Sequence, residues 1–541
     1  MSSRILSLSF TVVVALLSSE ARAQRVNTRV PESQVDTIFA KYNASTPGCS
    51  VGASVGGQPV LQKAYGMADL EHDVKNIPDT VFEAGSVSKQ FTAAAVLLLA
   101  QAGKLSLDDP VGKYIPELPD YGAPLTIRHM LNHTSGLRDW GSVEEIAGWP
   151  RTTRVYTHDH VIDIMSRQQH LNFPSGTNWS YSNTGFNLAA IIASRVSGDS
   201  FAEFSRKNIF APLGMTHTQW RDDFTRIVKG RAIAYSDNRG EFHQNMPFEN
   251  IYGNGGLLTT VGDLLKWNEN FVEPKVGGVD FVRQQQTPGK FNDGRSHDYG
   301  LGLYIGEYKG LKQVSHSGAT AGYRAFLTRF PDQHVSVAVL CNVSTAPAEL
   351  YGQQVADLFL APSLRPASPP KQVSLSAPDL DAKAGLYREL TTGEAMTIVH
   401  DKSALRIIPA TLVPVSPTRF VANDGRILEF DGRSGAKISY SNGTVESYER
   451  VQPANPTAQE LNAYVGSYTS DEAEVTMNVV LRNGALEISR RPNTTIKLTP
   501  IYADTFNGGR LGTIRFHRNA SGAVTEFSVV QYRVWDLRFR K

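Results

Sequence analysis

The stretch "FEAGSVSKQFTAAAVLLLAQAGKL" (residues 82–105) places Ser86 and Lys89 three residues apart, just before an apolar run. Gly103 is a typical residue beyond a helix end, so the stretch predicts a buried helix over residues 89–101. Residues three apart share one face of a helix. The spacing therefore predicts that the lysine amine reaches the serine hydroxyl where the helix begins.

A serine beside a lysine can be a nucleophile with its own base. The hydroxyl is a weak nucleophile until a base removes its proton, and a lysine amine can do so when burial keeps it neutral. The S-x-x-K spacing by itself is a common accident, and it recurs at Ser368 in a proline-rich stretch and at Ser434 in a glycine-bearing turn. Only at Ser86 does it open a helix with an apolar face.

A second candidate group is Tyr181 and Asn183, in "FPSGTNWSYSNTGFNLAAII" (residues 173–192), just before a helix predicted over residues 184–196. A tyrosine in such a loop can transfer protons when positive charge stabilises its phenolate, and an asparagine amide can donate to a substrate carbonyl. A loop aromatic is more often a packing residue, so both interpretations stay open.

The third group is His316-Ser317-Gly318-Ala319, on a predicted strand. A glycine among small residues would let a substrate lie alongside the strand and accept its hydrogen bonds. His316 is a candidate donor to the substrate, although a lone histidine is more often structural.

The order serine–lysine, tyrosine–asparagine, histidine–x–glycine resembles the three-motif pattern of the serine β-lactamases and penicillin-recognising enzymes. The chain resembles in particular the branch that holds class C β-lactamases, esterases and D-aminopeptidases. Two further segments look like those of the family, "LTIRHMLNHTSGL" (residues 125–137) and "GNGGLLTTVGDLLKW" (residues 253–267). The resemblance covers about residues 35–360.

The resemblance implies a role for each matching position. Ser86 is expected to be acylated, with Lys89 as its proton acceptor and Tyr181 moving protons to and from the leaving group. Asn183 is expected to orient the substrate carbonyl, and the backbone N–H groups of Ser86 and Ala319 to form the oxyanion hole. Whether Lys89 or Tyr181 is the principal base stays open, because coupled groups titrate as a set.

His316 departs from the family pattern, in which the third motif often begins with a lysine that grips a carboxylate. Histidine at this position is more similar to the D-aminopeptidases and esterases. We therefore expect weak carboxylate recognition and poor β-lactam turnover, with His316 as a catalytic residue and Ser317 and Gly318 against the substrate.

Composition and charge exclude several classes. The chain has 541 residues, 41% hydrophobic and 20% charged, with a net charge of +2. These values are those of ordinary globular proteins and give no sign of disorder or nucleic-acid binding. Residues 1–23 have the pattern of a secretory signal peptide, with a cut expected after Ala23, so we expect a secreted or periplasmic protein without a membrane span. No metal site or cofactor is predicted, because no metal-ligand or nucleotide-binding motif occurs.

Composition shifts divide the rest of the chain. Strand patterns at both ends of residues 24–360, with helices between, predict an α/β (α+β) domain with a central antiparallel sheet and a helical insertion. A proline- and serine-rich linker follows over residues 361–378. Residues 379–452 and 453–541 share the pattern L-x4-G-x-Y and predict two small antiparallel, lipocalin-like β-barrels.

The two cysteines, Cys49 and Cys341, lie in or beside predicted strands. Export permits a disulfide. Two thiols do not make a scaffold, however, and buried free cysteine behaves as a small hydrophobe, so unpaired thiols are the favoured interpretation and pairing stays open.

The expected function is an exported serine peptidase or amidase that cleaves short or linearised peptides next to a D-residue. A catalytic domain with two barrels is similar to the D-aminopeptidase architecture, in which a barrel loop can reach the cleft. It also resembles peptidases that act on linearised cyclic peptides such as linearised microcystin. Carboxylesterase, weak β-lactamase and penicillin-binding receptor with little turnover remain as alternatives. The expected partner is a small peptide or ester.

Overall fold

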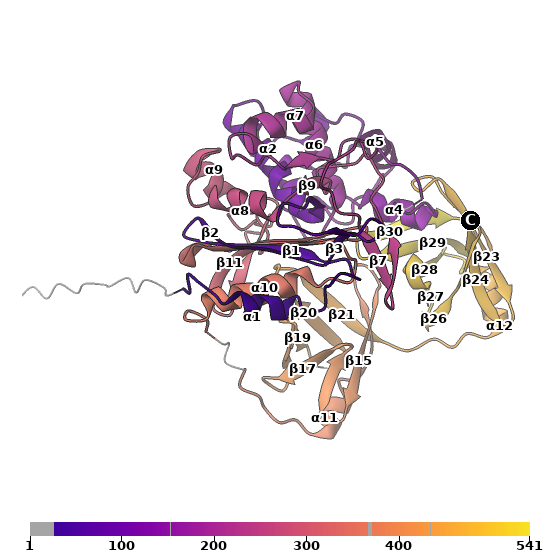
Figure 1. Cartoon of the computed structure of the whole chain (residues 1–541). Helices are drawn as coiled ribbons and strands as arrows, with labels where there is room; N and C mark the ends of the chain where they lie inside the picture. The colour runs from indigo at the N-terminus through magenta and orange to yellow at the C-terminus, as the bar shows by residue number, and fades with distance from the viewer. Residues whose placement is uncertain (1–25, 152, 366–369, 433) are drawn as a thin grey trace, which may run out of the picture.

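A computed structural model describes residues 26–151, 153–365, 370–432 and 434–541. The expected signal peptide and Ser368 lie outside these residues. The centre of the first domain is a six-stranded antiparallel sheet (Figure 1). Its strands, in spatial order, are β10 (Tyr304–Tyr308), β11 (Leu311–Thr320), β12 (Tyr323–Phe330), β13 (Val335–Cys341), β1 (Cys49–Val55) and β2 (Gln58–Tyr65).

Helices cover both faces of this sheet (Figure 1). One face packs against α10 (Ala348–Leu360), which contacts β12 and β13, and α1 (Glu32–Ile38) lies against α10. The other face holds α8 (Val261–Glu269) and, beyond it, the helical insertion predicted from the sequence. The insertion contains α2 (Lys89–Gln101), α3 (Ile127–Leu131), α4 (Trp140–Ala147), α5 (His158–Ser166), α6 (Asn183–Ser197), α7 (Phe201–Ser205) and α9 (Gly278–Gln285).

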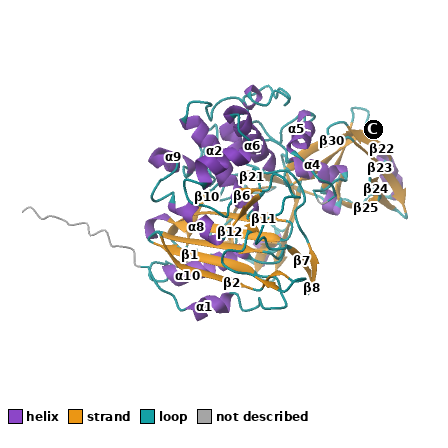
Figure 2. Ribbon diagram, turned by 45° about the horizontal axis from the view of Figure 1, so that its top comes forward, coloured by secondary structure: helices purple, strands orange, loops and turns teal. Residues whose placement is uncertain are grey.

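Several short strands lie outside the central sheet and the barrels, and β6, β7 and β8 are labelled in Figure 2. Small antiparallel pairings join β3 to β4, β7 to β8, and β9 to both β5 and β6. Their bounds are β3 (Met67–Asp69), β4 (Val74–Lys75), β5 (Phe82–Glu83), β6 (Gln219–Trp220), β7 (Tyr235–Asn238), β8 (Glu241–Gln244) and β9 (Leu257–Thr259).

Helix α2 is the centre of the helical insertion and has the predicted bounds. Its apolar residues are good helix formers apart from Phe91 and Val96, and all but a few are buried. The chain leaves the helix through Gly103, whose φ of +68° is a left-handed conformation that glycine adopts without strain. Helix α6 packs against α2 and likewise ends at a left-handed glycine, Gly198.

Cys49 and Cys341 form a disulfide, so the favoured interpretation of two free thiols was wrong. The two residues are directly opposite each other in the ladder between β1 and β13. Sequence spacing could not reveal this, because 292 residues separate the two cysteines and only the sheet register brings them together. The disulfide thus joins the strands from the two ends of the first domain.

The C-terminal part of the chain forms two antiparallel barrels, as predicted (Figure 1). The first is closed by eight strands. They are β14 (Gly385–Glu389), β15 (Ala395–Asp401), β16 (Ala404–Ile407), β17 (Ala410–Pro414), β18 (Arg419–Ala422), β19 (Ile427–Phe430), β20 (Gly435–Ser439) and β21 (Val445–Val451).

The second barrel is a nine-stranded sheet whose two end strands, β25 and β26, are consecutive in the chain, so it is nearly closed. Its strands are β22 (Gly466–Ser470), β23 (Val475–Arg482), β24 (Ala485–Arg490), β25 (Thr494–Lys497), β26 (Thr499–Tyr502), β27 (Thr505–Asn507), β28 (Thr513–Arg518), β29 (Val524–Gln531) and β30 (Val534–Arg540).

The L-x4-G-x-Y repeat has the same structure in both barrels. A short helix, α11 (Ala377–Asp381) or α12 (Ala458–Leu461), precedes the first strand. The tyrosine hydroxyl then donates to the backbone carbonyl four residues earlier, at 2.8 Å for both Tyr387 and Tyr468. The spacing that the two barrels share therefore corresponds to one repeated local fold.

The barrels differ in how they join the first domain. Apolar side chains of the second barrel belong to one continuous core with the helical insertion, whereas the first barrel has a separate core. The ion pair of Arg138 with Glu472, at 2.9 Å, crosses the interface of the second barrel, and the Arg138 side chain is only 1% exposed. The second barrel is thus firmly attached to the helices around the cleft. Among the described residues, no helix combines the length and apolarity needed to cross a bilayer.

Candidate active site

A cleft of about 720 Å³ lies where the helical insertion, strand β11 and the second barrel meet. Ser86 lines this cleft from η1 (Gly85–Ser88), the short 3-10 turn that precedes α2. Gly85 begins the turn with a φ of +50°, and the Ser88 hydroxyl donates to the Gly85 carbonyl at 2.6 Å. Ser86 is partly exposed within a buried segment, so its hydroxyl is accessible only from the cleft.

The Lys89 amine is fully buried and close to the serine. Its Nζ lies 3.1 Å from Ser86 Oγ, 2.9 Å from Asn183 Oδ1 and 2.7 Å from the Asn254 carbonyl oxygen. Burial lowers the pKa of Lys89 well below its usual value, and the positive charge of Arg533 lowers it further. The amine is therefore held at hydrogen-bonding distance from the serine in surroundings that favour its neutral form.

Tyr181 and Asn183 reach the same place from the start of α6. The Tyr181 ring centroid lies 4.8 Å from Lys89 Nζ. Burial raises the pKa of Tyr181, while a hydrogen bond with Ser86 and the charge of Arg533 act in the opposite direction. The Asn183 backbone N–H donates to Asp139 Oδ2 at 2.8 Å, which fixes the first turn of α6. Because Asn183 Oδ1 is occupied by Lys89, its amide NH₂ remains for a substrate carbonyl.

Strand β11 forms the opposite wall. Strand β10 pairs with β11 only as far as Ser315, so no strand of the described residues pairs with residues 316–320 on that side. A Cβ on Gly318 would lie 2.0 Å from the Ala84 carbonyl oxygen and 3.1 Å from the Ser86 nitrogen. The glycine therefore lets β11 pass directly against η1, which brings the Ala319 and Ser86 backbones together. Ser317, Gly318 and Ala319 all line the cleft.

His316 also lines the cleft, but both of its ring nitrogens have partners. Nδ1 lies 2.6 Å from the Ser317 carbonyl oxygen, which can only accept, so Nδ1 carries the proton. Nε2 then accepts from the Tyr299 hydroxyl at 2.8 Å. Burial lowers the pKa of His316 to about 3. The histidine is therefore neutral and has no free N–H to offer a substrate, so its expected role as a catalytic residue stays a prediction.

The sequence of residues 35–359 matches the family described as "Beta-lactamase". The chain belongs to this family. It is thus a serine hydrolase with a β-lactamase-like fold. The roles expected for Ser86, Lys89, Tyr181 and Asn183 stay predictions. The family match ends before the two barrels.

Relatives extend the similarity beyond the family domain. The chain is 28% identical over 435 residues to penicillin-binding protein 4* of Bacillus subtilis, covering 74% of this chain and 94% of that protein. It is 25% identical over 532 residues to a D-aminopeptidase of Gluconobacter oxydans, covering 94% and 98%. An octameric penicillin-binding protein homologue from Pyrococcus abyssi has a similar fold, with a TM-score of 0.55 at 23% identity, covering 86% of this chain and 98% of the other.

Three residues around the site were not predicted from the sequence. Asn254 supplies the third acceptor for Lys89, and Asp139 holds the Asn183 backbone. Arg533, from the turn between β29 and β30, places its guanidinium carbon 4.8 Å from the Tyr181 ring centroid. No local pattern marks Arg533, because it lies outside the β-lactamase family match and only barrel docking brings it to the cleft.

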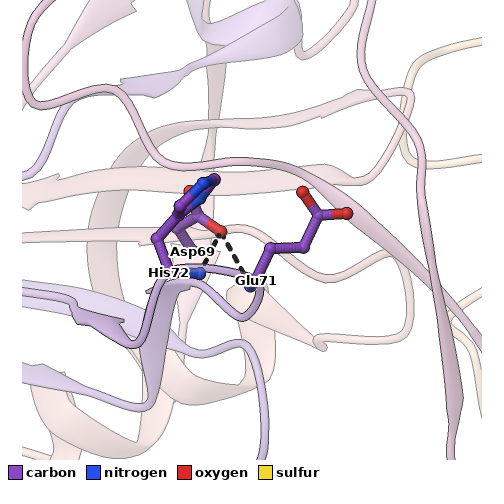
Figure 3. A group of neighbouring side chains, drawn as sticks. All are labelled: Asp69, Glu71 and His72. Carbon is purple, nitrogen blue, oxygen red and sulfur yellow. Dashed lines mark hydrogen bonds and ion pairs between the residues drawn. The ribbon is translucent and has the colours of Figure 1, made fainter.

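Asp69, Glu71 and His72 form a cluster with ligand atoms within 4.8 Å of one another (Figure 3). Asp69 accepts from the Glu71 and His72 backbone N–H groups at 2.9 and 3.2 Å and contacts His72 Nδ1 at 2.7 Å. These hydrogen bonds are the local bonds of an exposed turn, and they explain why the three side chains lie close together. None of the three residues lines the cleft.

Proposed function

We propose that this protein is an exported serine peptidase or amidase that cleaves short or linearised peptides next to a D-residue through an acyl-enzyme on Ser86. The observation that carries the proposal is the Lys89 amine, which lies 3.1 Å from the hydroxyl of Ser86 at the cleft. Burial lowers the pKa of this lysine and so favours its neutral form. A neutral amine at that distance is what a serine nucleophile requires.

In the proposed reaction, Lys89 takes the Ser86 proton as Oγ bonds to the substrate carbonyl carbon. The oxyanion accepts from the Ser86 and Ala319 backbone N–H groups. Tyr181 passes a proton to the leaving nitrogen as the C–N bond breaks, and is reprotonated from Lys89. Water then bonds to the acyl carbon and gives a proton to Lys89, the C–Oγ bond breaks, and Lys89 returns the proton to Ser86 Oγ. The pKa directions favour Lys89 as the base that begins the reaction, because burial removes the proton from Lys89 but retains it on Tyr181.

The substrate class rests on the relatives and on the charge of the cleft. Similarity to a D-aminopeptidase over nearly the whole chain supports an amide bond next to a D-residue. An esterase for neutral substrates would favour a neutral, apolar cleft, whereas this cleft is lined by Arg151, Arg324 and Arg533 and by one described carboxylate, Glu349. A charged peptide substrate is therefore the better fit.

Export forms part of the proposal. Residues 1–23 have the composition of a signal peptide, with cleavage after Ala23. The Cys49–Cys341 disulfide is the kind of bond that persists in an oxidising compartment such as the periplasm.

The test is Ser86→Ala, measured on a short D-alanyl peptide amide, its L-alanyl isomer and a short-chain aryl ester. We expect the wild type to prefer the D-alanyl amide and kcat/KM to fall by roughly 10³-fold or more in the variant, because only the nucleophile is removed. Circular dichroism should be unchanged. Ser45→Ala, an exposed serine, is the control and should retain activity. Comparable activity in Ser86→Ala would refute the assignment, and hydrolysis of the ester alone would favour a carboxylesterase.

A further inference from the structure

Three arginines line the cleft, and two of them already have partners. Arg151 makes a two-pronged ion pair with Glu249, with one N–H···O bond at 2.9 Å. Arg324 donates through NH1 to the backbone carbonyls of Ala321 and Tyr323, at 3.0 and 2.7 Å. Both guanidiniums thus already donate hydrogen bonds to the protein itself.

Arg533 differs from both. No hydrogen bond joins its guanidinium to another residue in the part of the chain that the structure describes, and its ion pair with the Asp139 carboxylate is long, at 3.9 Å. Its side chain is 34% exposed, toward the cleft that it lines. A guanidinium has five N–H donors in a fork that matches a carboxylate. Arg533 therefore presents N–H donors that no described residue uses beside the reaction centre.

Hydrogen bonds to backbone atoms, and not to the guanidinium, hold Arg533 in this position. The Arg533 carbonyl accepts from the Asp139 N–H at 3.3 Å and from Asn172 Nδ2 at 3.0 Å. Asn172 Oδ1 in turn accepts from the Trp535 N–H at 3.0 Å. The C-terminal side of the turn is thus fastened to the catalytic domain by three hydrogen bonds. This anchoring makes a rigid subsite and allows the side chain to be replaced without releasing the turn.

The place of Arg533 also indicates which part of a substrate it meets. Its guanidinium lies against the ring of Tyr181, the residue proposed to pass a proton to the leaving nitrogen. A group bound there belongs to the leaving side of the scissile amide. His316 cannot bind an anion at this edge, because it is neutral and both of its nitrogens are occupied.

We propose that Arg533 of the second barrel binds a carboxylate on the leaving-group residue of the substrate, and so makes the enzyme selective for peptides with an acidic group directly after the cleaved bond. This proposal rests on the proposed function above. It reverses the expectation of weak carboxylate recognition, because the missing lysine of the third motif is replaced by an arginine from another domain. The carboxylate is either the α-carboxylate of a terminal residue or an acidic side chain.

The test compares three substrates: D-alanyl-glycine, with an α-carboxylate; D-alanyl-D-aspartic acid α-amide, with a side-chain carboxylate; and neutral D-alanyl-glycinamide. We expect the wild type to favour one or both acidic substrates by roughly 10- to 100-fold in kcat/KM, as a charge-assisted hydrogen-bond pair provides. Arg533→Gln should abolish this ratio and Arg533→Lys should retain part of it. Arg324→Gln, the matched cleft arginine, should retain the ratio. The acidic substrate that loses its advantage in Arg533→Gln identifies the source of the carboxylate.

Binding to the inactive protein separates this proposal from the proposed function. Calorimetric titration of Ser86→Ala should show tighter binding of an acidic peptide than of the neutral one, and the difference should vanish in Ser86→Ala/Arg533→Gln. Equal loss of all three substrates in Arg533→Gln, with no acidic preference in either assay, would overturn the carboxylate subsite. Absence of hydrolysis by the wild type, with Arg533-dependent binding retained, would instead overturn the proposed function alone.

Discussion

Burial acts on Lys89 and Tyr181 in opposite and complementary directions. A low-dielectric environment disfavours the charged form of each group, so the pKa of the lysine falls and that of the tyrosine rises. Burial therefore favours a neutral amine and a protonated phenol beside the same serine. Each residue needs only its surroundings, and no additional base, to reach the protonation state that the proposed reaction uses.

Tyr181→Phe tests this division of roles, because it removes only the hydroxyl. We expect kcat for a peptide amide to fall by roughly 10²- to 10³-fold, since a poor leaving nitrogen must be protonated as the C–N bond breaks. An aryl ester leaves without such help and should be much less affected. Steady-state kinetics on both substrates gives the comparison. Equal losses on the amide and the ester would argue against proton transfer to the leaving group.

Tyr304→Phe is the matched control, because Tyr304 is another tyrosine that lines the cleft. Its hydroxyl has no part in the proposed reaction, and the substitution should change neither rate by more than a few-fold.

At the scale of the element, the site depends on how closely strand β11 passes η1. The edge of β11 beyond Ser315, which no described strand pairs on the β10 side, can accept a substrate as an additional strand, and Gly318 sets its distance from the nucleophile. The sequence indicated a reason for a small residue there. It did not indicate that the Ala84 carbonyl, rather than a substrate, leaves no room for a side chain at Gly318.

Gly318→Ala should therefore damage the oxyanion hole. The new Cβ would lie 2.0 Å from the Ala84 carbonyl oxygen, so β11 and η1 must move apart. We expect kcat/KM to fall by roughly 10²-fold or more, because the lost donor geometry acts on the transition state. The free energy of unfolding should fall by about 1–3 kcal/mol. Gly306→Ala, in β10 of the same sheet, is the control, because its Cβ would meet nothing within 4 Å. Full activity in Gly318→Ala would contradict this account.

Helices were predictable at this scale where the signals are local. The predicted helix over residues 89–101 has the observed bounds, because a continuous apolar run ends at a glycine that leaves the helix in the left-handed region. The helix predicted over residues 184–196 begins one residue earlier and ends one residue later in the structure. The cysteine pairing was not predictable, because it depends on strand register across 292 residues.

Over the whole molecule, the second barrel is part of the catalytic unit, whereas the first has its own core. The buried Arg138–Glu472 ion pair and the shared apolar core attach the second barrel to the helices that position Tyr181 and Asn183. This attachment explains how the turn between β29 and β30 can serve as a fixed wall of the cleft.

The buried histidines make the stability of the whole chain sensitive to acid. Burial lowers the pKa of His158 and His297 to about 4 and that of His316 to about 3, from 6.5. Below about pH 6.5 these histidines become protonated in the unfolded chain but stay neutral in the native protein. The free energy of unfolding should therefore fall as pH decreases toward about 4. Each such histidine contributes up to about 1.4 kcal/mol per pH unit.

The measurement is the free energy of unfolding in urea at pH 7.5, 6 and 5, with the proton uptake on unfolding. His297→Asn should reduce the proton uptake on unfolding by up to one proton, because asparagine does not titrate. The local hydrogen bond should survive, since the asparagine oxygen can accept from the Tyr299 N–H as Nδ1 does at 3.4 Å. A free energy of unfolding that is constant between pH 7.5 and pH 5 would show that these histidines titrate normally.

The sequence by itself determined the chemistry-bearing groups of the first domain and the kinds of elements that carry them. Serine and lysine share a helix turn, tyrosine and asparagine precede a second helix, and a glycine lies in a strand, all of which follow from short-range periodicity and turn chemistry. Only the tertiary structure decided that Cys49 pairs with Cys341, that the nitrogens of His316 are both occupied, and that Arg533 faces Tyr181. These features depend on contacts between residues far apart in the chain, which are fixed by sheet register and barrel docking and leave no local pattern in the sequence.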